Sequence, residues 1–374
     1  MSGDLTRTLD DAKDWLRERA AGRRHPLGGI DSGPALRAID TLPGTDPVSW
    51  AGHWAGIAAE FAGRAEALEK GGDPRAAREA WWQAYQFAFL GRYPVPSHPA
   101  KAEAYDRARG YFARAVALDD PPAQRVTVPF AGDRSGDGVT FWVVRPRGVT
   151  RPPVVMIWAG IDSWKEETYV TGAALRDRGF ATLHVDMPGT GQSPVFASGH
   201  HGAEGAERQW DPVFAWLAGS DLDAARVGAL GLSFGGYWAM KLAHTHRDQL
   251  AAAVNWGGGV HITFQPDWQA RSRNASSYLM DLMTARARIF NGATFEDYVA
   301  RCPGLSLLDQ GILDRPCAPL LLVNGIDDLQ NSAEDIWLSL RHGDPKTARL
   351  FPGGHMGTGP VAETVTDWLT TRLG

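Results

Sequence analysis

Cysteine is scarce in this chain, which has only Cys302 and Cys317 among its 374 residues. Two cysteines cannot build the disulfide framework of a small secreted domain, so we expect a reduced protein in the cytoplasm. Long apolar runs are missing as well, and none approaches the roughly 20 residues of a transmembrane helix. The first residues, Met1 to Arg7, lack the apolar core of a signal peptide. The sequence therefore predicts no association with a membrane.

A strong excess of one charge is also absent. Lysine and arginine together number 38 and aspartate and glutamate 43, which leaves a net charge of −5 near neutral pH. We expect no nucleic-acid partner, because such proteins carry a clustered basic surface. Arg286 and Arg288 are interpreted as a solvated helix face rather than an anion site. The segment Pro188–Ser193 lacks the lysine of a phosphate-binding loop, and His200 and His201 lack a cysteine or carboxylate at metal-ligand spacing. No cofactor and no metal are predicted.

The stretch that indicates a chemistry is Gly231–Gly235, which reads G-L-S-F-G. A short apolar run precedes it, as expected of a buried strand, and a segment of helical composition follows it. A G-x-S-x-G motif between a strand and a helix is the nucleophile elbow, in which glycines make room for a serine in a strained turn. The alternative is a serine in an ordinary glycine-rich loop. The flanking pattern favours Ser233 as a nucleophile.

A serine hydroxyl needs a base and an orienting acid, which follow the elbow in the order acid, then histidine. His355 lies in a glycine-rich loop after a predicted strand, which favours a loop-borne base over a buried structural histidine. Serine hydrolases commonly place the acid three residues after the glycine of an H-G-x-x-D turn. The corresponding sequence here is N-G-I-D-D, which selects Asp328. Asp327 stays open as the alternative, with a turn-capping role as its simpler interpretation.

The hydrophobic period changes near residue 122. Before it, apolar residues recur at helical spacing, and we expect helices that begin at Pro47, Pro74 and about Pro99. After it, strands alternate with helices, the latter from about residue 166 and around 204–217, which predicts an α/β fold with a mostly parallel sheet flanked by helices. We expect a helical cap domain over 1–122 and a catalytic domain over 123–374, with a helical excursion over 257–316 near the active site. The predicted strands cover 125–130, 139–144, 154–158, 181–185, 225–232, 251–256, 318–324 and 348–351.

Several motifs carry a resemblance to a known family. Residues Trp158–Glu167 are similar to a G-G-x-D-S-x-K-E-E motif, and Asp186–Ser193 is similar to D-x-P-G-x-G-x-S. Together with the elbow and the turns around Asp328 and His355, they resemble the FrsA-like esterase group of the α/β-hydrolases. That group includes 2,6-dihydroxypseudooxynicotine hydrolases and the fungal hydrolases that shorten polyketides. The resemblance spans nearly the whole chain and implies the α/β-hydrolase fold with an N-terminal helical cap, and a homodimer.

The resemblance also implies where an oxyanion is held. In this fold one N–H comes from the residue after the nucleophile, here Phe234, and one from the loop after the third strand. Resemblance places the second donor at Ile161. Asp162 follows it and either pins this loop or contacts the substrate, and pinning is favoured. Ala159 and Asn324 stand where the family pattern has glycine and histidine, and we expect both positions to supply backbone only.

Taken together, these features predict a serine hydrolase that needs no metal or cofactor and acts on a small-molecule carbonyl substrate. The 15 tryptophans and the large cap suit an enclosed site for a bulky, aromatic acyl group. Group members that hydrolyse a carbon–carbon bond beside a ketone favour an aryl or polyketide-type β-dicarbonyl substrate. The alternatives are a carboxylesterase, an acyltransferase or cyclase of secondary metabolism, and a catalytically silent small-molecule-binding protein.

Overall fold

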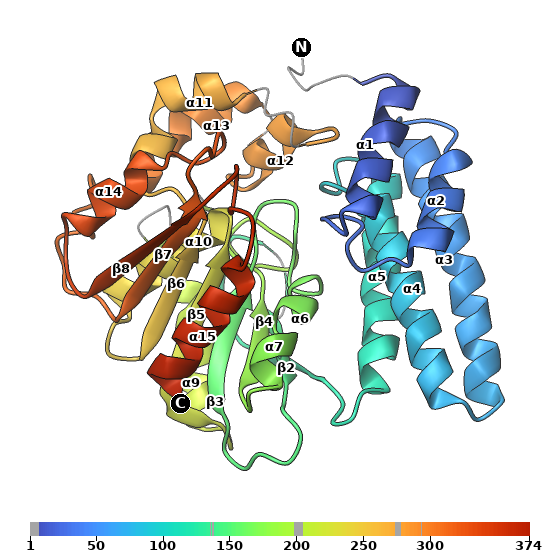
Figure 1. The fold of residues 1–374 in the computed structure, drawn as a ribbon, viewed down its shortest axis with the longest axis horizontal. Helices are drawn as coiled ribbons and strands as arrows, with labels where there is room; N and C mark the ends of the chain where they lie inside the picture. The colour runs from blue at the N-terminus through green and yellow to red at the C-terminus, as the bar shows by residue number, and fades with distance from the viewer. Residues whose placement is uncertain (1–6, 135, 137, 198–204, 274–277, 293) are drawn as a thin grey trace. The chain divides into compact units, whose positions relative to one another are not determined.

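The computed structural model describes residues 7–134, 136, 138–197, 205–273, 278–292 and 294–374. These residues form two compact units (Figure 1). One contains the described residues up to Ala123 together with residues 278–285, and the other contains the described residues of the ranges 124–273 and 286–374. Residues 278–285 therefore belong to the first unit, although they lie far downstream in the sequence.

The first unit is helical. Asp46 and Asp73 each accept hydrogen bonds from the first turn of the helix that follows, and a proline begins each of these helices, as the sequence predicts. The first two helices were not identified from the sequence, although Thr8 and Asp11 form a capping box before the first. The helices are α1 (Leu9–Ala21), α2 (Ser32–Asp40), α3 (Pro47–Lys70), α4 (Pro74–Arg92) and α5 (Pro99–Ala117).

Helix α4 is central to this unit, because it packs on both α3 and α5. Trp54 of α3 stacks on Phe87 of α4 with 6.2 Å between the ring centroids. The Nζ atom of Lys101 on α5 lies 2.8 Å from the carboxylate of Asp281. This ion pair joins residues 278–285 to the helices.

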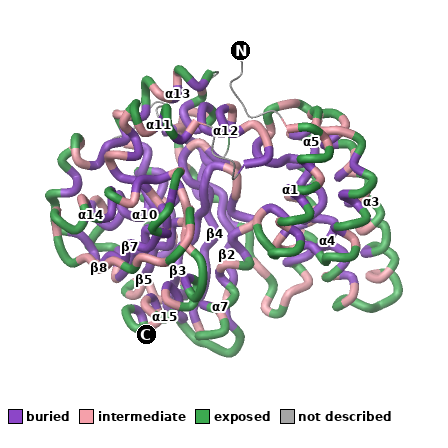
Figure 2. The backbone as a smooth tube through the Cα atoms, turned by 45° about the horizontal axis from the view of Figure 1, so that its top comes forward, coloured by how far each residue is buried: buried purple, intermediate pink, exposed green. Residues whose placement is uncertain are grey.

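The second unit is built on an eight-stranded sheet with the order β1-β2-β4-β3-β5-β6-β7-β8. Strand β2 pairs antiparallel with β1 and β4, and the other neighbours are parallel. Strands β3 and β4 are buried along their whole length, as the inner strands of a parallel sheet are (Figure 2). Each predicted strand is present with small shifts at its ends, which confirms the α/β class. The strands are β1 (Gln124–Val128), β2 (Val139–Val144), β3 (Pro153–Trp158), β4 (Ala181–Val185), β5 (Asp223–Leu232), β6 (Ala252–Trp256), β7 (Leu320–Gly325) and β8 (Lys346–Phe351).

Helices cover both faces of this sheet. Alternate residues of a strand point to opposite faces, and on β5 a Cβ atom at Gly228 would meet Leu373, whereas one at Gly231 would meet the first turn of the next helix. Leu230 packs with Leu373 in the apolar core on the first of these faces. The helices are α6 (Thr168–Thr171), α7 (Ala173–Arg176), α9 (Asp211–Ala218), α10 (Phe234–Thr245), α14 (Glu334–Leu340) and α15 (Val361–Leu373).

Some helices differ from the sequence prediction. The helix expected from residue 166 is divided into α6 and α7, and the one expected over 204–217 is a 3-10 turn, η1 (Ala206–Trp210), followed by α9; residue 204 lies outside the described residues. The described part of 257–316 contains η2 (Ile262–Phe264), α11 (Pro266–Ser272), α12 (Leu282–Arg288), α13 (Phe295–Arg301) and η3 (Cys302–Leu305). Among the residues that the structure describes, no helix is long and apolar enough to cross a membrane.

Candidate active site

Ser233 occupies a strained turn between β5 and α10, with φ 55° and ψ −129°. Neighbouring glycines permit this turn, because a Cβ atom at Gly231 would lie 2.0 Å from the carbonyl oxygen of Gly235. A Cβ atom at Gly235 would in turn lie 2.5 Å from the carbonyl oxygen of Ala159. The N–H of Ser233 donates to the carbonyl oxygen of Trp256 at 2.7 Å, which fixes the turn to the end of β6. A non-glycine residue held at positive φ is typical of a functional position.

The loops after β7 and β8 bring an aspartate and a histidine to this serine. Nε2 of His355 lies 2.7 Å from Oγ of Ser233, and its Nδ1 lies 2.8 Å from Oδ2 of Asp328. The neighbouring Asp327 is exposed, and its backbone N–H donates to the carbonyl oxygen of Gly353. The structure therefore brings Ser233, His355 and Asp328 into one hydrogen-bonded chain and leaves Asp327 outside it.

The carboxylate of Asp328 is fully buried and well supplied with donors. Oδ1 accepts the backbone N–H of Gln330 at 2.7 Å, and Oδ2 accepts the side-chain amide of Asn324 at 2.9 Å. Burial raises the pKa of this carboxyl, but the charge of His355 and the accepted hydrogen bonds lower it more. The pKa of Asp328 consequently lies below its ordinary value, and the group is ionised beside the imidazole.

Asn324 does more than the sequence interpretation assigned to it. Besides donating to Asp328, its side-chain oxygen accepts the N–H of Gly325 at 2.8 Å and that of Met356 at 3.0 Å. The expectation that this position supplies backbone only was therefore wrong. The side-chain amide of Asn324 therefore links Asp328 to Met356, the residue after His355. The departure from the family pattern at this position was the only signal in the sequence.

The histidine loop is also packed closely against β6 and β7. A Cβ atom at Gly325 would lie 1.9 Å from the carbonyl oxygen of Gly354, so only glycine lets the two loops approach this far. The indole N–H of Trp256 donates to the carbonyl oxygen of Met356 at 2.8 Å. Close backbone packing and the indole of Trp256 therefore hold the loop that carries His355.

The loop after β3 passes the serine side chain. A Cβ atom at Gly160 would lie 3.0 Å from Cβ and 3.1 Å from Oγ of Ser233. The next residue, Ile161, is buried, as is Phe234 at the start of α10. Within the described chain, neither of these two backbone N–H groups donates to another protein group. Asp162 is half-buried, and its role stays a prediction.

Two remaining expectations concern charged and metal-binding residues. Arg286 is buried rather than solvated, because its guanidinium contacts Gln269 and Ser272, so that part of the prediction was wrong; Arg288 is exposed. No cluster of three or more potential metal ligands occurs in the described residues. The pair at positions 200 and 201 lies outside them.

This fold and geometry define a class of protein. A mostly parallel sheet with a serine elbow after one strand, and an aspartate and a histidine after two later strands, is the α/β-hydrolase arrangement. The family model described as "Esterase FrsA-like" matches residues 36–340. The chain therefore belongs to the FrsA-like esterase family of α/β-hydrolases, which confirms the predicted family and fold.

Individual relatives agree with this assignment. The 2,6-dihydropseudooxynicotine hydrolase of Paenarthrobacter nicotinovorans is 29% identical over 291 residues, 75% of this chain and 71% of that protein. Esterase FrsA of Photobacterium profundum is 24% identical over 348 residues, 90% of this chain and 79% of that protein. The crystal structure of the 2,6-dihydroxy-pseudo-oxynicotine hydrolase shares the fold, with a TM-score of 0.77 and 22% identity over 96% of this chain and 95% of that one.

Other relatives are longer than this chain. Hydrolase ORFZ of Pyricularia oryzae is 31% identical over 271 residues, which are 65% of this chain and 62% of that protein. Hydrolase phmG of Phaeosphaeria nodorum is 26% identical, and the match covers 61% of its length. The chain thus spans less than two thirds of these two proteins.

Proposed function

We propose that this protein is a serine hydrolase in which Ser233 is the nucleophile, His355 the general base and Asp328 the acid that orients it. The observation that carries the proposal is the hydrogen-bonded chain from Ser233 Oγ through His355 to Asp328, with contacts of 2.7 and 2.8 Å. Ser233 and His355 are only partly buried, whereas Asp328 is fully buried. Ser233 is therefore accessible to a substrate, whereas the carboxylate of Asp328 is shielded from solvent.

The proposed reaction begins when Ser233 Oγ attacks the carbonyl carbon of the substrate and passes its proton to Nε2 of His355. The carboxylate at Nδ1 stabilises the imidazolium that forms. The N–H groups of Phe234 and Ile161 hold the oxyanion, a role supported by the contact of Gly160 with Ser233 and by the lack of other described acceptors. His355 then protonates the leaving group, and water releases the acyl group from Ser233.

For the substrate, we propose an aryl or polyketide-type β-dicarbonyl compound. Attack on one carbonyl breaks the bond to the carbon between the two, and that carbon leaves as an enolate because the second carbonyl accepts the electron pair. Protonation by His355 converts it into a methyl or methylene ketone, and hydrolysis of the acyl-enzyme yields a carboxylic acid. Similarity to the 2,6-dihydropseudooxynicotine hydrolase supports this substrate class.

A carboxylesterase is the second candidate. Similarity to esterase FrsA, which extends over 90% of this chain, favours it. The same three residues serve both reactions, because both begin with attack on a carbonyl. Only the leaving group differs, an alkoxide in one case and an enolate in the other.

The experiment has two parts. A fluorophosphonate probe should label the wild type and leave Ser233→Ala unlabelled, and an unlabelled wild type would refute the nucleophile. Competition between short p-nitrophenyl esters and aryl 1,3-diketones, followed by mass spectrometry, then shows whether the protein cleaves an ester bond or a carbon–carbon bond. Efficient ester cleavage with no cleavage of any diketone would assign the protein as a carboxylesterase.

We also propose that residues 1–122 act as a helical cap domain, that the protein is a homodimer, and that it lies in the cytoplasm. The resemblance that covers the N-terminal residues supports the cap. Removal of residues 1–122 should abolish turnover of bulky substrates, and a truncated protein with unchanged kcat/KM would contradict this role. Light scattering on the full chain tests the dimer.

A further inference from the structure

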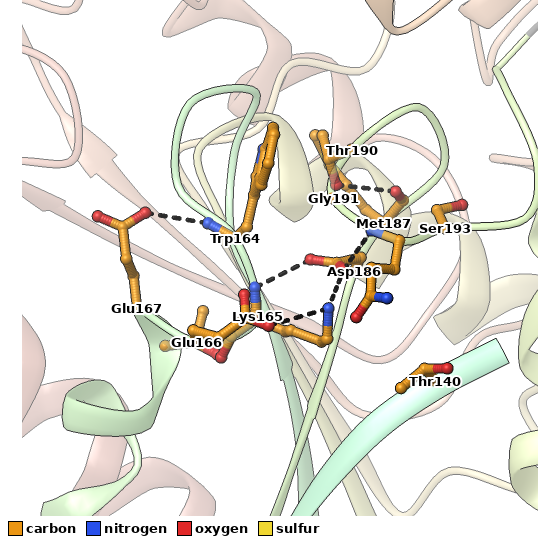
Figure 3. Close-up of polar contacts among 12 residues, drawn as sticks. Thr140, Trp164, Lys165, Glu166, Glu167, Asp186, Met187, Thr190, Gly191 and Ser193 are labelled. Carbon is orange, nitrogen blue, oxygen red and sulfur yellow. Dashed lines mark hydrogen bonds and ion pairs between the residues drawn. The ribbon is translucent and has the colours of Figure 1, made fainter. Parts of the chain in front are cut away.

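A cluster of buried charges lies at the ends of β3 and β4 (Figure 3). Nζ of Lys165 is 2.7 Å from Oδ2 of Asp186 and 3.1 Å from Oε1 of Glu166. The three side chains are 0%, 1% and 2% exposed, respectively. Desolvating charges is costly, and apolar residues of similar volume often stabilise a fold equally well. A contribution to the stability of the fold therefore does not by itself explain why these three charged residues are buried here.

Asp186 binds the main chain of two loops. Its Oδ1 accepts the backbone N–H of Lys165 at 2.9 Å, in the loop after β3. Its Oδ2 accepts the backbone N–H of Gln192 at 2.8 Å, in the loop after β4. Gly191 has φ +45°, and a Cβ atom there would lie 2.2 Å from the carboxylate, so glycine lets the second loop close over it. This carboxylate is consequently a cross-link between neighbouring loops at one edge of the sheet.

The loop after β3 passes the nucleophile before it reaches Lys165. Gly160 lies against the side chain of Ser233, as described above. Between these points the indole N–H of Trp164 donates to the carbonyl oxygen of Ile161 at 3.3 Å. The backbone around Ile161 is thus held on one side by β3 and on the other by the bonds that end on Asp186.

We propose that Asp186 and Lys165 are positioning residues that keep the N–H of Ile161 directed at the oxyanion. This inference rests on the proposed function. The N–H donors of an oxyanion hole must already be in position before the reaction, because the negative charge that they stabilise develops only in the transition state. A shift of about 1 Å in such a group can cost about 100-fold in rate. Losing either the Asp186 carboxylate or the Lys165 charge that pairs with it should therefore reduce kcat and leave KM little changed.

The test compares two buried lysines in the full-length protein. Lys165→Met removes the charge and keeps an apolar side chain. Lys241→Met is the matched control, because Lys241 on α10 is also fully buried and its Nζ lies 3.0 Å from Glu207. For each variant we would measure the melting temperature, kcat and KM with whichever substrate the competition assay shows to be turned over. We would also measure the inhibition constant of an aryl trifluoromethyl ketone, which adds to a serine and leaves an oxyanion.

Lys165→Met should lose about 100-fold in kcat and bind the trifluoromethyl ketone correspondingly more weakly. Lys241→Met should lose comparable thermal stability yet keep its kcat and its inhibition constant. Asp186→Asn is the second variant, and it should reproduce the kinetic loss at nearly unchanged side-chain volume. Equal kinetic effects of Lys165→Met and Lys241→Met, or an unaffected Asp186→Asn, would overturn the inference. A wild type that no fluorophosphonate labels would instead refute the proposed nucleophile.

Discussion

Replacing Asp328 by asparagine tests the proposed site most directly, because the contacts of this carboxylate predict what an amide does there. Oδ1 accepts the N–H of Gln330, and Oδ2 faces two donors, Asn324 and His355. An amide nitrogen at Oδ2 would meet the donor of Asn324 and would also force the imidazole proton onto Nε2, toward Ser233. An amide nitrogen at Oδ1 would meet the N–H of Gln330. Either orientation removes the negative charge beside the imidazolium.

We therefore expect Asp328→Asn to lose about 10⁴-fold in kcat, as such a substitution does in serine proteases. This corresponds to about 5.4 kcal/mol of transition-state stabilisation. Asp327→Asn is the control, one residue away and exposed, and it should change kcat by about twofold or less. Initial rates would be measured on both variants after circular dichroism has shown that they are folded. A larger loss in Asp327→Asn would transfer the acid to that residue and refute our reading of the site.

Further predictions concern the nucleophile, the loop beside it and pH. Ser233→Ala should fold normally and lose about 10⁶-fold in kcat, and wild-type-like turnover would refute the mechanism. In Gly160→Ala the added methyl group would lie 3.1 Å from Ser233 Oγ, so we expect about 100-fold lower kcat/KM, whereas Gly63→Ala, with open space around it, should leave kcat/KM unchanged. Burial lowers the pKa of His184 well below its ordinary value and that of His244 to about 4, so both take up a proton at a lower pH in the folded protein than in the unfolded chain. Because the unfolded chain binds these protons near pH 6.5, the free energy of unfolding should fall below that pH by up to about 1.4 kcal/mol per pH unit for each histidine. Urea titrations that give equal stability at pH 7 and pH 5 would contradict this.

Local patterns predicted most of the fold. Asp46 and Asp73 precede prolines, and this combination located the starts of α3 and α4 within the sequence alone. The strands are short apolar runs bounded by turn residues, and such runs are recognisable without tertiary information. Helices α6 and α7 were merged in the prediction, because Gly172 between them is a weak break in an otherwise helical pattern.

Long-range contacts could not be predicted in this way. The bond between Asn324 and Met356 spans 32 residues, and that between Lys165 and Asp186 spans 21. Neither spacing belongs to a helix or a hairpin, so only the parallel register of the strands brings these groups together. For the same reason the spacing of N-G-I-D-D could rank Asp328 above Asp327 but could not exclude Asp327. The distinction depends on which carboxylate turns inward at the end of β7.

The site depends on adjacent parallel strands whose carboxyl ends meet at one edge of the sheet. Six neighbouring strands contribute, in the order β4, β3, β5, β6, β7 and β8 across the sheet. The loops that follow them carry, respectively, Asp186, Gly160, Ser233, Gly257, Asp328 and His355. A parallel sheet buried on both faces resists slipping, because a shift by one residue would turn every side chain to the opposite face. The strands therefore determine the position at which each loop begins, but they do not determine the conformation of the loop. Close backbone contacts such as the one at Gly325, and the buried charges around Asp186, supply that second constraint. Positions that hold these loops should accordingly affect turnover more than their distance from the substrate suggests.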